Sequence, residues 1–72
     1  MLLFEIKAAA QKLKPDESID VATMMSAASL SHQLDGLENE NGHYMLFRTE
    51  PNTRTGGCKI TCTGVIDFGG DK

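Results

Sequence analysis

The chain has 72 residues, of which 40% are hydrophobic and 24% charged, and its formal net charge is −3 at pH 7. A chain this short buries only about 60% of the surface that its unfolded form exposes, so residues 1–72 are expected to form a single domain with one core. The composition is too apolar for a disordered chain, and no segment approaches the ~20 apolar residues of a membrane helix. The apolar start is interrupted at Glu5 and Lys7, too early for a signal peptide. We therefore expect a cytoplasmic domain without a membrane partner.

The first predicted element is an amphipathic helix over residues 2–13. Its apolar positions recur at helical spacing, and lysines, a glutamate and a glutamine fill the other side. Pro15 cannot continue a helix, so the helix should end before it. The apolar positions are Leu2, Leu3, Ile6, Ala9, Ala10 and Leu13.

Residues 19–38 allow two interpretations. They form either one long helix, or two helices over about residues 19–26 and 29–39 that are separated at the small residues 26–29. In the second interpretation Leu30, Leu34 and Leu37 make the core-facing stripe of the later helix. Gly36 lies inside that helix, where glycine costs about 1 kcal/mol relative to alanine. The Asn and Gly residues of segment 38–42 are typical of a helix end.

A β-hairpin is predicted for the second half of the chain. Residues 44–47 and 58–63 are rich in β-branched, aromatic and other apolar side chains, and they flank the polar segment 51–57 with its proline and glycines. Alternation places Cys58, Ile60 and Cys62 on the core face and the residues between them in water. Gly64 should end or bend the second strand, while residues 65–68 pack back on the body and 69–72 fray.

The strand at residues 44–47 is apolar on both faces. Tyr44 and Leu46 share one face, and Met45 and Phe47 share the other. One face is expected to cover the core and the other to be covered by a helix, the C-terminal tail or a second subunit. A homodimer is therefore one of the predicted assemblies.

The two cysteines are expected to be reduced and buried. On a strand, their i,i+4 spacing separates the Cα atoms by roughly 13 Å, too far for a disulfide. Two cysteines cannot complete a four-ligand zinc site, and His32 and His43 have no metal-motif spacing. We therefore predict no metal and no cofactor, and the reduced thiols fit a cytoplasmic protein.

The order of three helices, an Asn-Gly stop, a strand, a long polar turn and a last strand resembles a winged helix-turn-helix domain. In that family the third helix ends in L-x-x-L-E-x-x-x-G, the wing tip carries arginine, and the last strand closes on I/L-T-x-x-G. The matching residues here are Leu34, Leu37, Glu38, Gly42, Arg54, Ile60, Thr61 and Gly64. Residues 54–64 are also similar to short winged-helix proteins of T7-like phages that restrain host transcription. The resemblance implies an α+β fold, with N-terminal helices before a C-terminal β-hairpin wing, and a role in transcription regulation.

DNA binding is the function that the resemblance implies, with the third helix in the major groove and the wing on the backbone or in the minor groove. Gln33 is suited to read adenine, and Arg54 is suited to contact phosphate. The candidates for DNA contact are Ser29, Ser31, His32, Gln33, Arg48, Asn52, Thr53, Arg54, Thr55 and Lys59. Residues 15–42 contain no lysine or arginine, which opposes DNA binding, because affinity for DNA comes chiefly from cations that neutralise phosphates.

The alternative is a protein-binding regulator or inhibitor. An acidic helical face complements a basic patch, such as one on a protein of the transcription machinery. The candidates for protein contact are Asp16, Glu17, Asp20, Asp35, Glu38, Glu40, Tyr44 and Leu46.

Catalysis is not expected. His32 is flanked by Ser29 and Ser31, but neighbours on one helix do not supply a nucleophile, a base and an orienting group around a preformed cleft. A core of this size also leaves little room for a closed pocket. The sequence therefore predicts a small non-enzymatic regulator that binds either DNA or a protein.

Overall fold

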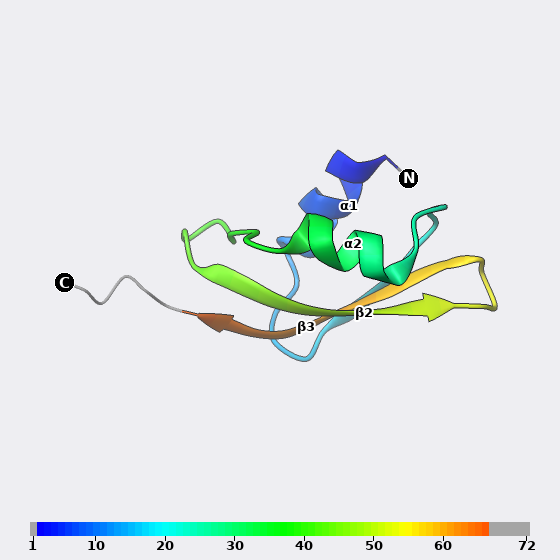
Figure 1. The fold of residues 1–72 in the computed structure, drawn as a ribbon. Coiled ribbons are helices and arrows are strands. Elements are labelled where there is room, and N and C mark those ends of the chain that lie inside the picture. Colours follow the sequence, from blue (N-terminus) through cyan, green and yellow to red (C-terminus); the bar gives the residue numbers. More distant parts are fainter. Residues whose placement is uncertain (1, 67–72) are drawn as a thin grey trace.

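The computed structural model describes residues 2–66. Its elements are α1 (Leu3–Ala10), β1 (Ser18–Val21), α2 (Ala27–Leu34), β2 (Tyr44–Asn52) and β3 (Gly57–Ile66). The strands form one antiparallel sheet in the order β1-β3-β2, and both helices lie on the same side of it (Figure 1). The described residues thus form a small α+β domain with two helices, where the winged helix-turn-helix resemblance implied three.

Helix α1 follows the predicted amphipathic pattern but is shorter than residues 2–13. Ile6 and Ala10 are fully buried, and Leu3 and Leu13 pack against the same core. The Glu5 carboxylate accepts a hydrogen bond from the Leu2 N–H at 2.8 Å, which satisfies a donor at the helix start. After Ala10 the chain continues in tight turns as far as Leu13, before Pro15.

The helix expected at residues 19–26 does not form, and neither interpretation of that segment was right. β1 occupies residues 18–21, with Val21 buried and Ile19 half-buried toward the core, and Ser18 and Asp20 facing the other side. Ile19 pairs with Ile60 and Val21 with Cys58. With β1 in place, β3 has a hydrogen-bonding neighbour on each edge. This stabilisation comes from residues distant in sequence, so the local spacing of apolar residues does not predict it.

Helix α2 begins at the small residues where the two-helix interpretation expected a break. The Ser26 hydroxyl accepts a hydrogen bond from the Ser29 N–H at 3.1 Å, as an N-cap does. Leu30 and Leu34 are buried at i,i+4 spacing, as predicted. The helix ends at Leu34 rather than near residue 39, because Gly36 has a φ of +81°, a left-handed conformation that stops a helix.

The predicted hairpin is confirmed, and its tip is tighter than expected. β2 and β3 are joined by residues 53–56, where the Gly56 N–H donates to the Asn52 carbonyl at 2.9 Å and Gly56 has a φ of +78°. Leu46 pairs with Gly64 and Phe47 with Cys62, so Thr63 is an extra residue that forms a β-bulge. The bend predicted at Gly64 is this bulge, and β3 continues beyond it to Ile66.

The core lies between the helices and one face of the sheet. It is built by side chains from α1, β1, α2 and β3, namely Ile6, Ala10, Val21, Leu30, Leu34, Cys58 and Ile60. Residues 65 and 66 belong to β3 instead of packing back on the body, and the expectations for residues 67–72 lie outside the described residues.

The thiols of Cys58 and Cys62 are buried and unbridged on the core face of β3, as predicted. The Cys58 thiol lies 3.6 Å from the Met25 carbonyl oxygen, to which it donates. Neither helix in the part of the chain that the structure describes has the length and apolar character needed to cross a membrane.

Candidate functional site

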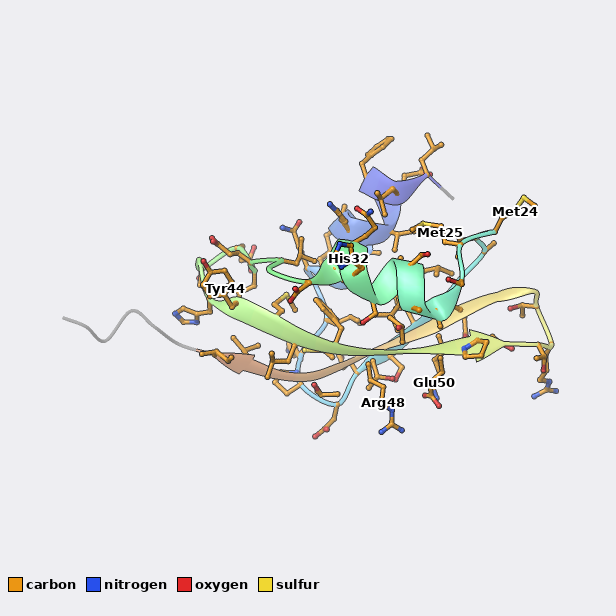
Figure 2. The ribbon with its side chains drawn as sticks, in the orientation of Figure 1. Met24, Met25, His32, Tyr44, Arg48 and Glu50 are labelled. Carbon is orange, nitrogen blue, oxygen red and sulfur yellow. The ribbon has the colours of Figure 1, made fainter. Side chains whose placement is uncertain are left out.

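The side of the sheet opposite the helices, called the open face here, is the first candidate contact surface. Figure 2 shows the side chains of Arg48 and Glu50 on β2 pointing away from the helices. Strand alternation and pairing put their neighbours on the same side. The open face contains Ser18, Asp20, Tyr44, Leu46, Arg48, Glu50, Lys59, Thr61 and Ile66.

One end of the open face is apolar. Tyr44 pairs with Ile66, and Leu46 is next on β2, with exposed fractions of 39%, 37% and 45% for Tyr44, Ile66 and Leu46. Their β2 neighbours Met45 and Phe47 turn to the core side, where Met45 is buried. The prediction that one face of this strand covers the core is confirmed. Neither helix covers the other face (Figure 1).

The other end of the open face is polar and close to neutral. Lys59 on β3 lies between Glu50 on β2 and Asp20 on β1, so a cation stands between two carboxylates across the sheet. The Arg48 guanidinium lies 3.7 Å from the Glu50 carboxylate, and both side chains are well exposed. This pattern fits a mixed-charge protein contact better than a uniformly positive DNA contact.

The hairpin tip is organised by Asn52. Its amide group donates to the Asp20 carboxylate at 2.8 Å, and its side-chain oxygen accepts from the Arg54 N–H at 3.1 Å. The side chain of Asn52 therefore holds the tip to β1. A shallow depression of about 270 Å³ beside it is lined by residues that include Thr53, Arg54 and Lys59.

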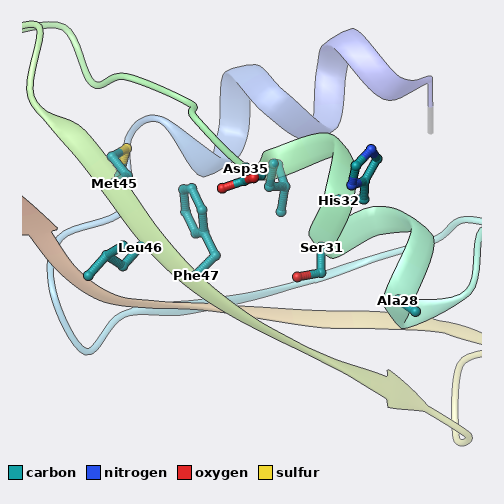
Figure 3. A pocket seen from close by; sticks show the side chains of 8 residues that line it. Ala28, Ser31, His32, Asp35, Met45, Leu46 and Phe47 are labelled. Atoms are coloured by element: carbon teal, nitrogen blue, oxygen red, sulfur yellow. The ribbon is translucent and has the colours of Figure 1, made fainter.

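A second hollow of about 400 Å³ runs between α2 and β2. Its α2 side is formed by Ala28, Ser31, His32, Leu34 and Asp35, and its β2 side by Met45, Leu46 and Phe47 (Figure 3). Within residues 2–66 no hydrogen bond joins the side chains of Ser31, His32 and Asp35, so the hollow contains no assembled nucleophile and base. It is an open groove along an outer strand of the sheet.

The predicted DNA-contact residues are divided between two sides of the molecule. Ser29, Ser31, His32 and Gln33 lie on α2, on the helix side, whereas Arg48 and Lys59 lie on the open face. Ser29 is engaged in the helix cap with Ser26. One flat contact therefore does not include both sets, and only the hairpin tip, with Asn52, Thr53, Arg54 and Thr55, stays together as a unit.

The acidic residues do not form one helical face, which corrects that prediction. Asp16, Glu17 and Asp20 lie in and before β1, and Asp35, Glu38 and Glu40 lie in the connection from α2 to β2. Because β1 and β2 are at opposite edges of the sheet, the two groups are separated.

Sequence reasoning missed Glu50 and Ile66 as members of the open face. Glu50 could have been found, because the period of two along a strand puts Glu50 on the same face as Tyr44, Leu46 and Arg48. Ile66 could not be found in this way, since the bulge at Thr63 reverses the alternation along β3.

Comparison with protein-family models, curated proteins and solved structures gives no match. No group of three or more His, Cys, Asp or Glu residues among those described is placed to hold a metal ion. Function is therefore inferred from the surfaces of the molecule.

Proposed function

We propose that this chain is a small protein-binding regulator whose contact surface is the open face of the sheet. The observation that carries the proposal is the apolar cluster of Tyr44, Leu46 and Ile66, which lies exposed beside a polar region of mixed charge. Protein interfaces commonly combine an apolar centre that contains aromatic residues with a polar rim. A cluster of large apolar side chains on a sheet face that no helix covers is typical of a binding surface.

The winged helix-turn-helix resemblance supports a partner in the transcription machinery. The acidic connection from α2 to β2 lies next to the apolar cluster, since Glu38 pairs with Tyr44 in an isolated bridge. A basic surface of such a partner would therefore be complementary in charge to this side of the apolar cluster. Opposite charges at the rim steer the encounter, and the apolar centre supplies most of the affinity. The proposed role is binding without catalysis.

The test compares two charge substitutions at exposed apolar positions. Leu46→Glu changes the open face, and Phe4→Glu makes the same change on α1, where Phe4 is 68% exposed. Immobilised chains are incubated with the purified RNA polymerase of the source organism. Retention by the wild type and by Phe4→Glu, with loss in Leu46→Glu, supports the proposal. Equal retention by all three chains, or by none, contradicts it.

Contact with DNA through the hairpin tip is the second candidate. The observation that favours it is the cluster of polar and cationic side chains at the tip, where Thr53, Arg54 and Lys59 line one depression. Arginine and threonine side chains at such a tip are suited to phosphate contact. Because the rest of the molecule carries few positive charges, the tip would have to supply most of the affinity for DNA.

A titration against generic duplex DNA at low and moderate salt separates the two candidates. Binding that fades steeply with salt and weakens in Arg54→Ala is the result expected for the tip. Thr63→Ala, an exposed change on β3 away from the tip, is the matched control. Absence of binding even at low salt eliminates the DNA candidate and leaves the protein-binding proposal.

A further inference from the structure

The outer edge of β2 has backbone groups that point away from the sheet. The Met45 N–H donates to the Leu37 carbonyl at 2.9 Å, which is on the side opposite β3. Cys62 is the β3 partner of Phe47, but its backbone groups bond on the other side of β3. The Cys62 N–H donates to the Glu17 carbonyl, and the Cys62 carbonyl accepts from the Asp16 N–H. Because the orientation of backbone groups alternates along a strand, those of Phe47 and Thr49 also point outward. No hydrogen bond from another segment of residues 2–66 reaches them.

This exposed edge has a defined length. At one end, Leu37 and Asn39 bond to the backbone of Met45 and His43 at 2.9 Å each and occupy the edge. At the other end, β2 stops at Asn52 and the chain turns through residues 53–56. The open stretch is therefore residues 46–52, and an exposed edge of this kind accepts another strand.

We propose that a second copy of this chain pairs with the edge, antiparallel, about a two-fold axis at Thr49. In this register Thr49 lies opposite Thr49 of the second copy, and Arg48 lies opposite Glu50 of the second copy. The two Thr49 residues exchange hydrogen bonds, and each Phe47 N–H donates to the Pro51 carbonyl of the other copy. Pro51 has no N–H, but its backbone groups point away from β3, so no hydrogen bond between β2 and β3 is missing because of it. The result is a continuous sheet through both copies with two identical contacts, as in an isologous dimer.

The charges on β2 select this register. The Arg48 and Glu50 side chains are 69% and 48% exposed, so both are available to a partner. A shift of the axis by one residue, to Arg48 or to Glu50, places Arg48 opposite Arg48 or Glu50 opposite Glu50, and like charges directly opposite are destabilising. Only the axis at Thr49 gives two Arg–Glu pairs.

The ends of the edge exclude the registers further away. An axis at Phe47 would put the second copy's strand opposite residues 43–45, where Leu37 and Asn39 already bond. An axis at Pro51 would face two prolines that have no N–H. The Thr49 register instead brings the hairpin tip of each copy, with Arg54, toward the connection that contains Glu38 and Glu40, which adds a second charge complementarity. It also places Pro51 of the second copy beside Phe47, at the groove between α2 and β2.

Charge exchange tests the proposal in solution. Sedimentation equilibrium of the wild type is expected to show a dimer, and Arg48→Glu or Glu50→Arg alone weakens dimerisation at least about tenfold, because each places like charges opposite one another twice. An equimolar mixture of these two variants forms a heterodimer, since every pair is then complementary, and the double variant R48E/E50R dimerises again. Lys12→Glu, a similar charge change on an exposed residue after α1, leaves the dimer unchanged. Circular dichroism verifies that each variant is folded.

Hydrogen exchange provides a test without substitutions. The amide protons of Phe47 and Thr49 are expected to exchange more slowly as the wild-type concentration rises, because they become bonded only in the dimer. A wild type that sediments as a monomer up to millimolar concentration overturns the proposal. So do single variants that dimerise like the wild type, a mixture that stays monomeric, or exchange at these two amides that does not depend on concentration. The dimer leaves the open face uncovered, so its failure would not affect the proposed function.

Discussion

Replacement of Gly57 by alanine tests how closely β1 approaches β3. A Cβ atom on Gly57 would overlap the Val21 carbonyl oxygen and lie 2.9 Å from its carbonyl carbon and 3.1 Å from the Ala22 Cα. These are backbone atoms at the end of a strand pair, so relief requires that the strands move apart. Gly57 itself is buried, and the displacement therefore extends to Val21 and Cys58 of the core.

We expect Gly57→Ala to lower the free energy of unfolding by about 2 kcal/mol, within the ~1–3 kcal/mol typical of overpacking. For a domain of this size that corresponds to a fall in the melting temperature of roughly 8–16 °C. Thermal and urea unfolding followed by circular dichroism measures both quantities. Gly64→Ala on the same strand is the control, because its Cβ would meet only the Leu46 Cδ1 at an ordinary 3.9 Å. That control should leave stability unchanged or raise it by about 0.4–1 kcal/mol, by restricting the unfolded chain.

The interpretation is refuted if Gly57→Ala and Gly64→Ala unfold at the same temperature. Equal stability would mean that β1 does not approach β3 as closely as the structure has it. A loss of stability in Gly64→Ala alone would place the tight approach at the bulge instead.

Three further predictions concern the core, the helix cap and the thiols. Leu30→Ala should lower the free energy of unfolding by about 2–5 kcal/mol, because Leu30 is fully buried. Met24→Ala should change it by less than about 0.5 kcal/mol, because Met24 is fully exposed. Urea unfolding measures both changes. Ser26→Ala removes the acceptor of the Ser29 N–H and should cost about 1 kcal/mol, while Ser31→Ala on the exposed side of α2 serves as its control in the same assay. Both thiols should resist a thiol reagent in the folded protein and react fully in denaturant, because Cys58 and Cys62 are buried on the core face; rapid labelling of the native protein would contradict this.

The site was predictable only in part. Alternation along residues 44–47 indicated an apolar surface on each side of the strand, and the structure has one of them exposed on the open face. The grouping of Leu46 with Arg48, Glu50 and Lys59 depends on the β2–β3 register. The separation of the acidic residues onto opposite edges depends on the strand order β1-β3-β2, and no local pattern encodes that order.

The sequence by itself determined the elements whose signals are local. The helical spacing of Ile6 and Ala10, the i,i+4 pair Leu30 and Leu34, and the alternation along residues 58–62 each correctly identify a core-facing surface. These periodicities arise from the backbone geometry of one element and need no partner. The end of α2 could also have been predicted from Gly36, since this glycine adopts a left-handed conformation that few other residues tolerate.

Only the tertiary structure decided residues 18–21. Ile19 and Val21 fit a short helix or a short strand equally well by pattern, and four residues carry too little local preference to choose between them. The strand conformation is favoured because residues 18–21 form hydrogen bonds with the edge of β3 and place Ile19 and Val21 against the core. The β3 partners of these residues lie some forty positions later in the chain. The same long-range pairing makes β3 the central strand and leaves β2 with an exposed edge, so the surfaces proposed here for binding and for dimerisation exist only once the sheet has formed.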